Sequence, residues 1–175
     1  MRLIRAISLG LVVGLALVAC QTAASAPTAA PTAHVNLFLT ADTVQGSTNL
    51  TDAEKAAGLT CVQRNLYAHN EEIVWRARVI DPATGQPMDD QALSSVIVQL
   101  PDQDLTMNYG GHPHTNPVDY FWTVSFDIPE GYPTGTLDYD IVATASDGRT
   151  GTFEPFPVSS SLLTVTSDVR PVISQ

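Results

Sequence analysis

The segment Met107-Asn108-Tyr109-Gly110-Gly111-His112-Pro113-His114 gathers the side chains of this sequence that are best suited to bind a metal. Imidazole binds copper or zinc through a neutral ring nitrogen, so His112 and His114 are candidate ligands. Two histidines on one loop need further donors, and the candidates are Cys61, His69, Met88 and Met107. Copper is preferred over zinc because thioether sulfur favours Cu(I). The alternative is a solvated polar loop that binds no metal.

Local catalytic motifs are absent from the sequence. It contains no Gly-x-Ser-x-Gly, no His-Glu-x-x-His and no glycine-rich phosphate loop between a strand and a helix. Scattered residues can also form a catalytic triad, but no nucleophile next to a histidine can be nominated here. We therefore predict a protein that is not an enzyme.

The charge balance limits the possible partners. Eighteen acidic residues oppose eight basic ones, which gives a net charge of −10. Such a surface repels phosphates, so nucleic acid is not an expected partner. Six aspartates (81, 89, 90, 102, 104 and 119) lie near predicted strand ends, where they either bind calcium or only keep the surface soluble.

The N-terminus reads as an export signal. Arg2 and Arg5 precede an apolar run over residues 6–19, and small residues lead directly to Cys20. The run is shorter than the roughly 20 residues that a membrane-spanning helix needs. Residues 1–19 are therefore predicted to be a signal peptide.

The stretch Leu17-Val18-Ala19-Cys20 resembles the lipobox of bacterial lipoproteins. This resemblance implies that Cys20 becomes the first mature residue and carries acyl chains such as palmitate, which attach it to a membrane of the cell envelope. Gln21 differs from the aspartate of inner-membrane retention signals, so the outer membrane or the cell surface is favoured. After Cys20, the Ala-, Thr- and Pro-rich sequence to residue 33 is a predicted flexible tether.

Cys61 is then the only other cysteine in an oxidising compartment, so no internal disulfide is expected. The roles left open for Cys61 are those of a buried small apolar residue, a metal ligand or a partner in an intermolecular disulfide.

Beyond the tether, apolar and polar residues alternate in short runs. One side of a strand is predicted to carry Val118, Tyr120, Trp122, Val124, Phe126 and Ile128. Similar runs lie at 73–79 and 137–145, with turn signals at Asp147-Gly148 and 81–85. The only helical signal is the capping box Thr51-Asp52-Ala53-Glu54. The prediction is an all-β antiparallel sandwich of about seven strands over residues 34–166, with one short helix in a loop and a tail at 167–175. A closed barrel is the alternative.

The stretch 135–143 is similar to the penultimate strand of immunoglobulin-like and fibronectin-like domains, with Tyr139 at a corner and Ile141 at a core position. Trp75 resembles the core tryptophan of the third strand in these domains, and Cys61 resembles their first core cysteine. The resemblance implies an immunoglobulin-like sandwich and says nothing about chemistry.

Two aromatic residues are candidates for contact with a partner. Phe121 breaks the alternation of its strand and faces outward, and Tyr132 lies in the loop at 129–133. They either form an exposed patch or are covered by the tether or a second layer. The predicted function is that of a lipid-anchored binding module or accessory subunit that contacts another envelope protein. The main alternative is a metal-binding envelope lipoprotein.

Overall fold

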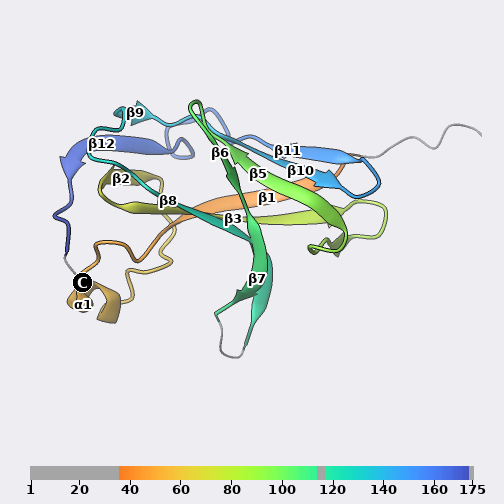
Figure 1. The fold of residues 1–175 in the computed structure, drawn as a ribbon, viewed down its shortest axis with the longest axis horizontal. Helices are drawn as coiled ribbons and strands as arrows, with labels where there is room; N and C mark the ends of the chain where they lie inside the picture. Colours follow the sequence, from red (N-terminus) through yellow and green to blue (C-terminus); the bar gives the residue numbers. More distant parts are fainter. Residues whose placement is uncertain (1–35, 114–116, 174–175) are drawn as a thin grey trace, which may run out of the picture. The chain divides into compact units, whose positions relative to one another are not determined.

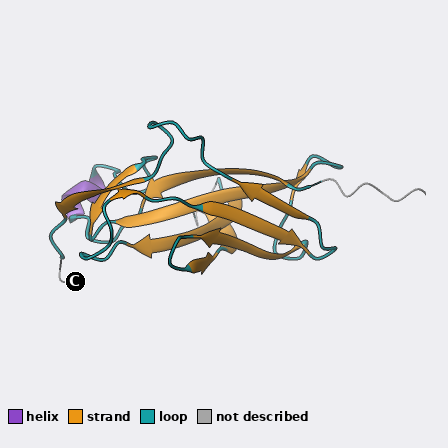
Figure 2. Cartoon of the chain, turned by 90° about the horizontal axis from the view of Figure 1, so that it is seen from above, coloured by secondary structure: helices purple, strands orange, loops and turns teal. Residues whose placement is uncertain are grey.

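The alternating runs form strands, as predicted, in the computed structural model, which describes residues 36–113 and 117–173. These residues belong to one compact unit, Ala33–Gln175. Figure 1 shows the arrangement of the strands, and Figure 2 shows them running lengthwise with the single helix at one end. The predicted all-β sandwich with one short helix is confirmed. The predicted signal peptide, the predicted lipid attachment at Cys20 and the predicted tether lie outside the described residues.

Two large antiparallel sheets hold the core between them. The first sheet has the strand order β1 (Phe38–Gln45), β3 (Glu72–Asp81), β8 (Asp119–Asp127), β7 (Asn108–His112), and β4 (Gln86–Pro87) pairs with the end of β3. The second sheet has the order β11 (Thr150–Phe153), β10 (Asp140–Ala145), β5 (Leu93–Gln99), β6 (Asp104–Thr106). This strand order is that of an immunoglobulin-like sandwich, with β6 added beside the third strand.

The inward residues of both sheets form the predicted core. On β3 these are Ile73, Trp75, Ala77 and Val79, and β8 contributes Trp122 from its predicted inner side. From the second sheet, Val96, Val98 and Ile141 are fully buried against them. Trp75 meets Tyr139 edge to face, with ring centroids 5.7 Å apart. Aromatic pairs of this geometry add to the free energy gained by burial.

Two details of the immunoglobulin-like resemblance are wrong. Trp75 lies on β3, which occupies the second strand position of the fold and not the third. Cys61 is exposed in a loop with φ of 65°, so it is neither a core cysteine nor a buried small apolar residue. Ile141 does occupy the expected core position on β10.

The turns follow the chemistry of their residues. Gly148, between β10 and β11, has φ of 87°, and Gly85, between β3 and β4, has φ of 71°. Glycine adopts positive φ at little cost because it has no Cβ. The helix α1 (Asp52–Ala56) begins at a capping box in which Thr51 and Glu54 each accept a hydrogen bond from the other's backbone N–H.

A third, small sheet extends the fold beyond the expected seven strands and beyond the predicted domain boundary at residue 166. It has the order β2 (Leu66–His69), β12 (Thr164–Val169), β9 (Gly135–Thr136), and its β2–β12 pair is parallel. Strand β12 therefore continues to Val169, and the Arg170 N–H donates to the carbonyl oxygen of His69. The start of the expected tail is thus part of the folded domain.

The buried tyrosines give the fold a dependence on alkaline pH. Burial raises the pKa of Tyr139 to about 12, and burial also raises the pKa of Tyr67. An unfolded tyrosine titrates near pH 10. Because the folded state favours the protonated phenols, their contribution to stability is complete below about pH 10 and is lost as pH rises toward 12.

We therefore expect tyrosinate absorbance and circular dichroism to change together above pH 10, as the sandwich unfolds and releases these phenols. Full ionisation of all five tyrosines near pH 10 with an unchanged dichroism spectrum would contradict this expectation.

Candidate functional site

A groove runs along the outer face of the first sheet, where β8 separates from β3. The last backbone pair between these strands joins Ala77 to Trp122, and beyond it β3 pairs with β4 instead. The resulting groove has a volume of about 450 Å³. Its lining includes Thr40, Asp42, Gln63, Arg76, Arg78, Asp119 and Phe121.

Two arginine–aspartate pairs line this groove. Arg76 binds Asp42 on the neighbouring β1 through two nearly parallel hydrogen bonds, Nε to Oδ1 at 2.8 Å and Nη2 to Oδ2 at 2.6 Å. The Asp42 carboxylate thereby raises the pKa of Arg76. Arg78 forms an ion pair with Asp119 across the gap between β3 and β8, and both side chains are well exposed. Exposed ion pairs contribute little to stability, so breaking this pair costs little free energy. Its charges are therefore available to a ligand.

Phe121 lies on the groove side of β8, facing outward as predicted, but its ring is not bare. The imidazole of His112 stacks on it with ring centroids 5.0 Å apart, and the Arg76 guanidinium lies 5.8 Å from its centroid. Phe121 is half-buried as a result. The groove therefore presents charged and amide groups around a partly covered aromatic ring.

Tyr132 lies apart from Phe121, so the structure does not bring the two predicted contact residues into one patch. The Tyr132 ring meets Phe126 at 5.2 Å, and Phe126 pairs with the inward-facing Ile73. The Tyr132 hydroxyl donates to the Asp102 carboxylate at 3.0 Å. Tyr132 is therefore on the inner side of β8, and Phe121 is on the outer side.

The predicted metal ligands lie in separate environments. Met107 is buried in the core, and Cys61 is exposed in a loop. His69 is buried with its Nε2 2.9 Å from the carbonyl oxygen of Tyr132. His112 stacks on Phe121, and His114 lies outside the described residues. Met88, the remaining candidate donor, is a buried core residue whose carbonyl oxygen accepts from Trp122.

Within residues 36–113 and 117–173, no three His, Cys, Asp or Glu side chains are grouped so that they could hold a metal ion. Several aspartates considered for calcium have protein partners instead, such as Asp81 with Arg149 at 2.9 Å. Binding of copper or zinc at His112 and His114 stays a prediction.

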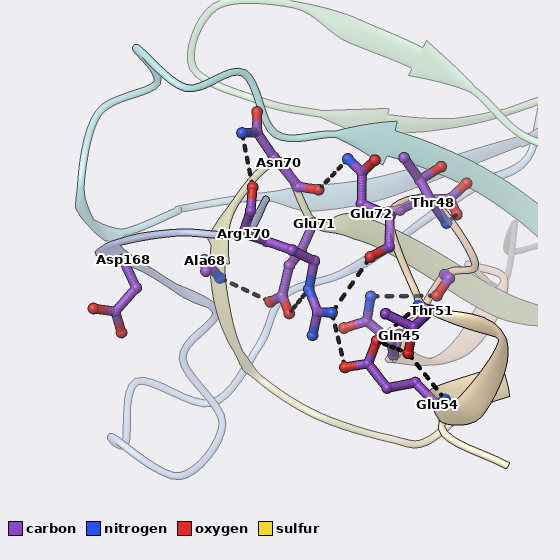
Figure 3. Close-up of polar contacts among 12 residues, drawn as sticks. Gln45, Thr48, Thr51, Glu54, Ala68, Asn70, Glu71, Glu72, Asp168 and Arg170 are labelled. Carbon is purple, nitrogen blue, oxygen red and sulfur yellow. Dashed lines mark hydrogen bonds and ion pairs between the residues drawn. The ribbon is translucent and has the colours of Figure 1, made fainter. Parts of the chain in front are cut away.

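A buried ionic cluster, which the sequence analysis missed, lies at the opposite end of β3 (Figure 3). Glu71 is only 3 % exposed, and its carboxylate accepts from Ala68 N–H at 2.8 Å, Arg170 Nε at 2.9 Å and Arg64 Nη1 at 3.3 Å. Arg170 also donates to Glu54 of α1 at 2.9 Å. Hydrogen bonds from Thr51 and Arg170 lower the pKa of Glu54 to about 2.

The cluster joins the helix, β2 and the C-terminal segment, and every charge in it has a partner of opposite sign. An arrangement in which the charges satisfy one another fits a structural role better than ligand binding. The local sequence signals here are the capping box with Glu54 and the turn residue Asn70, and neither predicts the pairing of Glu71 with Arg64 and Arg170.

Together, the fold and the groove define an all-β sandwich protein with an open polar surface on one sheet. Comparison with known protein families, curated proteins and solved structures found no match to this chain. Among the described residues, no helix is long and apolar enough to cross a membrane.

Proposed function

We propose that this chain is a lipid-anchored protein of a bacterial cell envelope that acts, without catalysis, as a binding module or accessory subunit for another envelope protein. The resemblance of Leu17-Val18-Ala19-Cys20 to a lipobox supports the anchor at Cys20. The acidic composition supports attachment through acyl chains, because it offers no basic patch for anionic lipids.

The groove on the first sheet is the observation that carries the binding role. It places two of the chain's few arginines beside two aspartates on an open sheet face. The exposed Arg78–Asp119 pair can exchange its partners for charges of a bound protein with little loss of stability. A partner that offers both charge signs along an extended surface suits this groove, since complementary charges provide specificity.

The test is site-specific crosslinking in native membranes. A photo-crosslinking residue at the exposed Thr40 of the groove should yield one defined adduct. The same residue at Thr152, which is exposed on β11 of the second sheet, is the matched control and should not yield it. The charge reversal Arg78→Glu should reduce the Thr40 adduct severalfold, because it places two negative charges together.

Cys20→Ser is the control for the anchor, since a serine cannot carry the acyl chains. If the partner lies at the membrane, the Thr40 adduct should disappear in the Cys20→Ser chain. Equal adducts from Thr40 and Thr152, or none at either position, would contradict the binding role. An unmodified Cys20 in mass spectrometry would contradict the anchor.

A further inference from the structure

The β7–β8 hairpin extends beyond the body of the first sheet as a two-stranded ribbon (Figure 1). Strand β8 pairs with β3 only over Trp122–Asp127, whereas residues 119–121 pair with β7 alone. Beyond the point where β8 leaves β3, Met88 N–H donates to the carbonyl oxygen of Val79. This end of β3 is therefore already paired and cannot supply the ribbon with a third strand. A two-stranded ribbon is marginally stable in water and gains from a third strand.

The other long edges of the two large sheets are covered over part of their length or blunted. The β1 edge binds the loop before β2, with Gln45 N–H donating to Val62 and Arg64 N–H to Thr43. The β11 edge receives the Leu37 N–H at Thr150. Strand β6 is only three residues long and begins with Asp104. Short and charged edge strands are devices that prevent association.

In the third sheet, β2 is covered by side chains. The carbonyl oxygen of Asn65 and that of His69 accept from the β12 segment, so Leu66 and Ala68 face the opposite edge. There the guanidinium of Arg64 donates to the Leu66 carbonyl, and the Glu71 carboxylate accepts from Ala68 N–H. The buried ionic cluster thus closes this edge.

Among the described residues, strand β7 shows no such protection of its outer edge over Asn108–Gly111. Its sequence Asn108-Tyr109-Gly110-Gly111-His112 contains no proline and no lysine or acidic residue, and among the described strands only β8 pairs with it. On the inner face of the ribbon, Tyr120 remains 57 % exposed. Unprotected strand edges of this kind add a further strand by backbone hydrogen bonds.

We propose that the β7 edge binds the β7 edge of a second copy of this chain, antiparallel and centred on Gly110, so that the two first sheets become continuous. In this register Gly110 lies opposite Gly110 of the second copy, and Tyr109 lies opposite Gly111 of the second copy. Such a contact is isologous and closes after two chains. It uses a surface apart from the groove and does not depend on the proposed function.

The alternation of large and small residues favours this occupant. Tyr109 projects on the same face as its β8 neighbour Trp122, with ring centroids 5.3 Å apart. Gly111 has no side chain, and the position that a Cβ would take is covered by Val118 Cγ1 at 2.5 Å and by the Tyr120 ring at 3.2 Å. Tyr109 of the second copy, opposite Gly111, would therefore pack beside these side chains and meet the exposed Tyr120 ring. Aromatic residues placed across from edge glycines stabilise strand pairs.

Charge also favours a second copy over a basic partner strand. The whole chain is acidic, but β7 itself has no acidic residue, and the carboxylate of Asp119, opposite His112, is paired with Arg78. The edge therefore gives a basic strand no specific attraction. It also gives a second copy no close repulsion. A contact of five residues is small, so the affinity should be modest and should increase on a membrane, where the chains are confined.

Disulfide trapping of the full chain in membranes tests the register. In a Cys61→Ser background, Gly110→Cys should give a crosslinked dimer, because antiparallel partners have Cα atoms about 4.5–5.5 Å apart, within the range of a disulfide. A Cβ at Gly110 meets no atom closer than 3.7 Å, so the substitution fits the monomer. The matched control Asn108→Cys should not crosslink, since its two copies would lie about 13 Å apart. The Cys61→Ser chain alone gives the baseline.

A second pair of variants tests the association without a disulfide. Gly110→Asp places two carboxylates opposite each other and should raise the dissociation constant about fivefold, whereas Gly110→Ala should change it little. The mass of the native protein in detergent, measured over a range of protein concentrations, gives the dissociation constant of each variant. A folded Gly110→Cys chain that does not crosslink would overturn the proposal, as would equal crosslinking at Asn108 or a chain that stays monomeric at every concentration. A β7 crosslink only to a different protein would assign the edge to that partner and likewise reject the second copy.

Discussion

Replacing Glu71 with alanine should lower the free energy of unfolding by about 3–5 kcal/mol, the range found when one partner of a buried ion pair is removed. The carboxylate accepts from both Arg64 and Arg170, and the Ala68 N–H would also lose its acceptor. Because small domains are stable by only about 5–15 kcal/mol, this loss is a large share of the total. Denaturant unfolding should show a lower midpoint with an unchanged slope.

Two companion variants separate the charge from the shape. Glu71→Gln keeps the size of the side chain and removes its charge, so it should lose stability by an intermediate amount. Glu130→Ala, at an exposed position, should stay within about 0.5 kcal/mol of the unchanged chain. Hydrogen exchange at the Ala68 amide should accelerate in Glu71→Ala because the free edge of β2 loses its cover. If Glu71→Ala unfolds like Glu130→Ala, the cluster has no structural role.

The sequence predicts the strands better than it predicts their places in the sheets. Alternation along Ile73–Val79 and along β8 correctly indicates the inward side, because the side-chain period of a strand is two. The same pattern carries no information on which strands are neighbours. The resemblance to immunoglobulin-like domains therefore places Trp75 on the third strand of the fold, whereas the structure has it on the second.

The groove and the ionic cluster depend on contacts that local patterns do not contain. Arg170 and Glu71 are 99 residues apart in the chain, and their pairing requires β12 to return beside β2. The groove exists because β4 replaces β8 at the end of β3, which is a competition between two distant segments for one strand edge. By contrast, the capping box of α1 is wholly local, and the sequence predicts it correctly.

Replacing Trp75 with alanine should lower the free energy of unfolding by about 3–5 kcal/mol, the usual cost of removing a large aromatic side chain from a core. Trp75 is fully buried, and its edge-to-face contact with Tyr139 joins the two large sheets. The loss should appear as a lower denaturation midpoint, and the near-ultraviolet dichroism of the aromatic core should weaken. A change below about 1 kcal/mol would contradict the packing described for this position.

Phenylalanine substitutions at the two tryptophans provide a sharper comparison, because both are buried but their indole groups differ in hydrogen bonding. Trp122 Nε1 donates to the carbonyl oxygen of Met88 at 3.1 Å, whereas Trp75 Nε1 makes no hydrogen bond to a described residue. Trp122→Phe removes that bond and leaves a carbonyl without its donor, and Trp75→Phe removes a donor that is buried without an acceptor. Since an unsatisfied buried group costs about 1–3 kcal/mol, Trp75→Phe should be the milder substitution by about 1 kcal/mol or more. The reverse order would show that the Trp75 indole has an acceptor in solution.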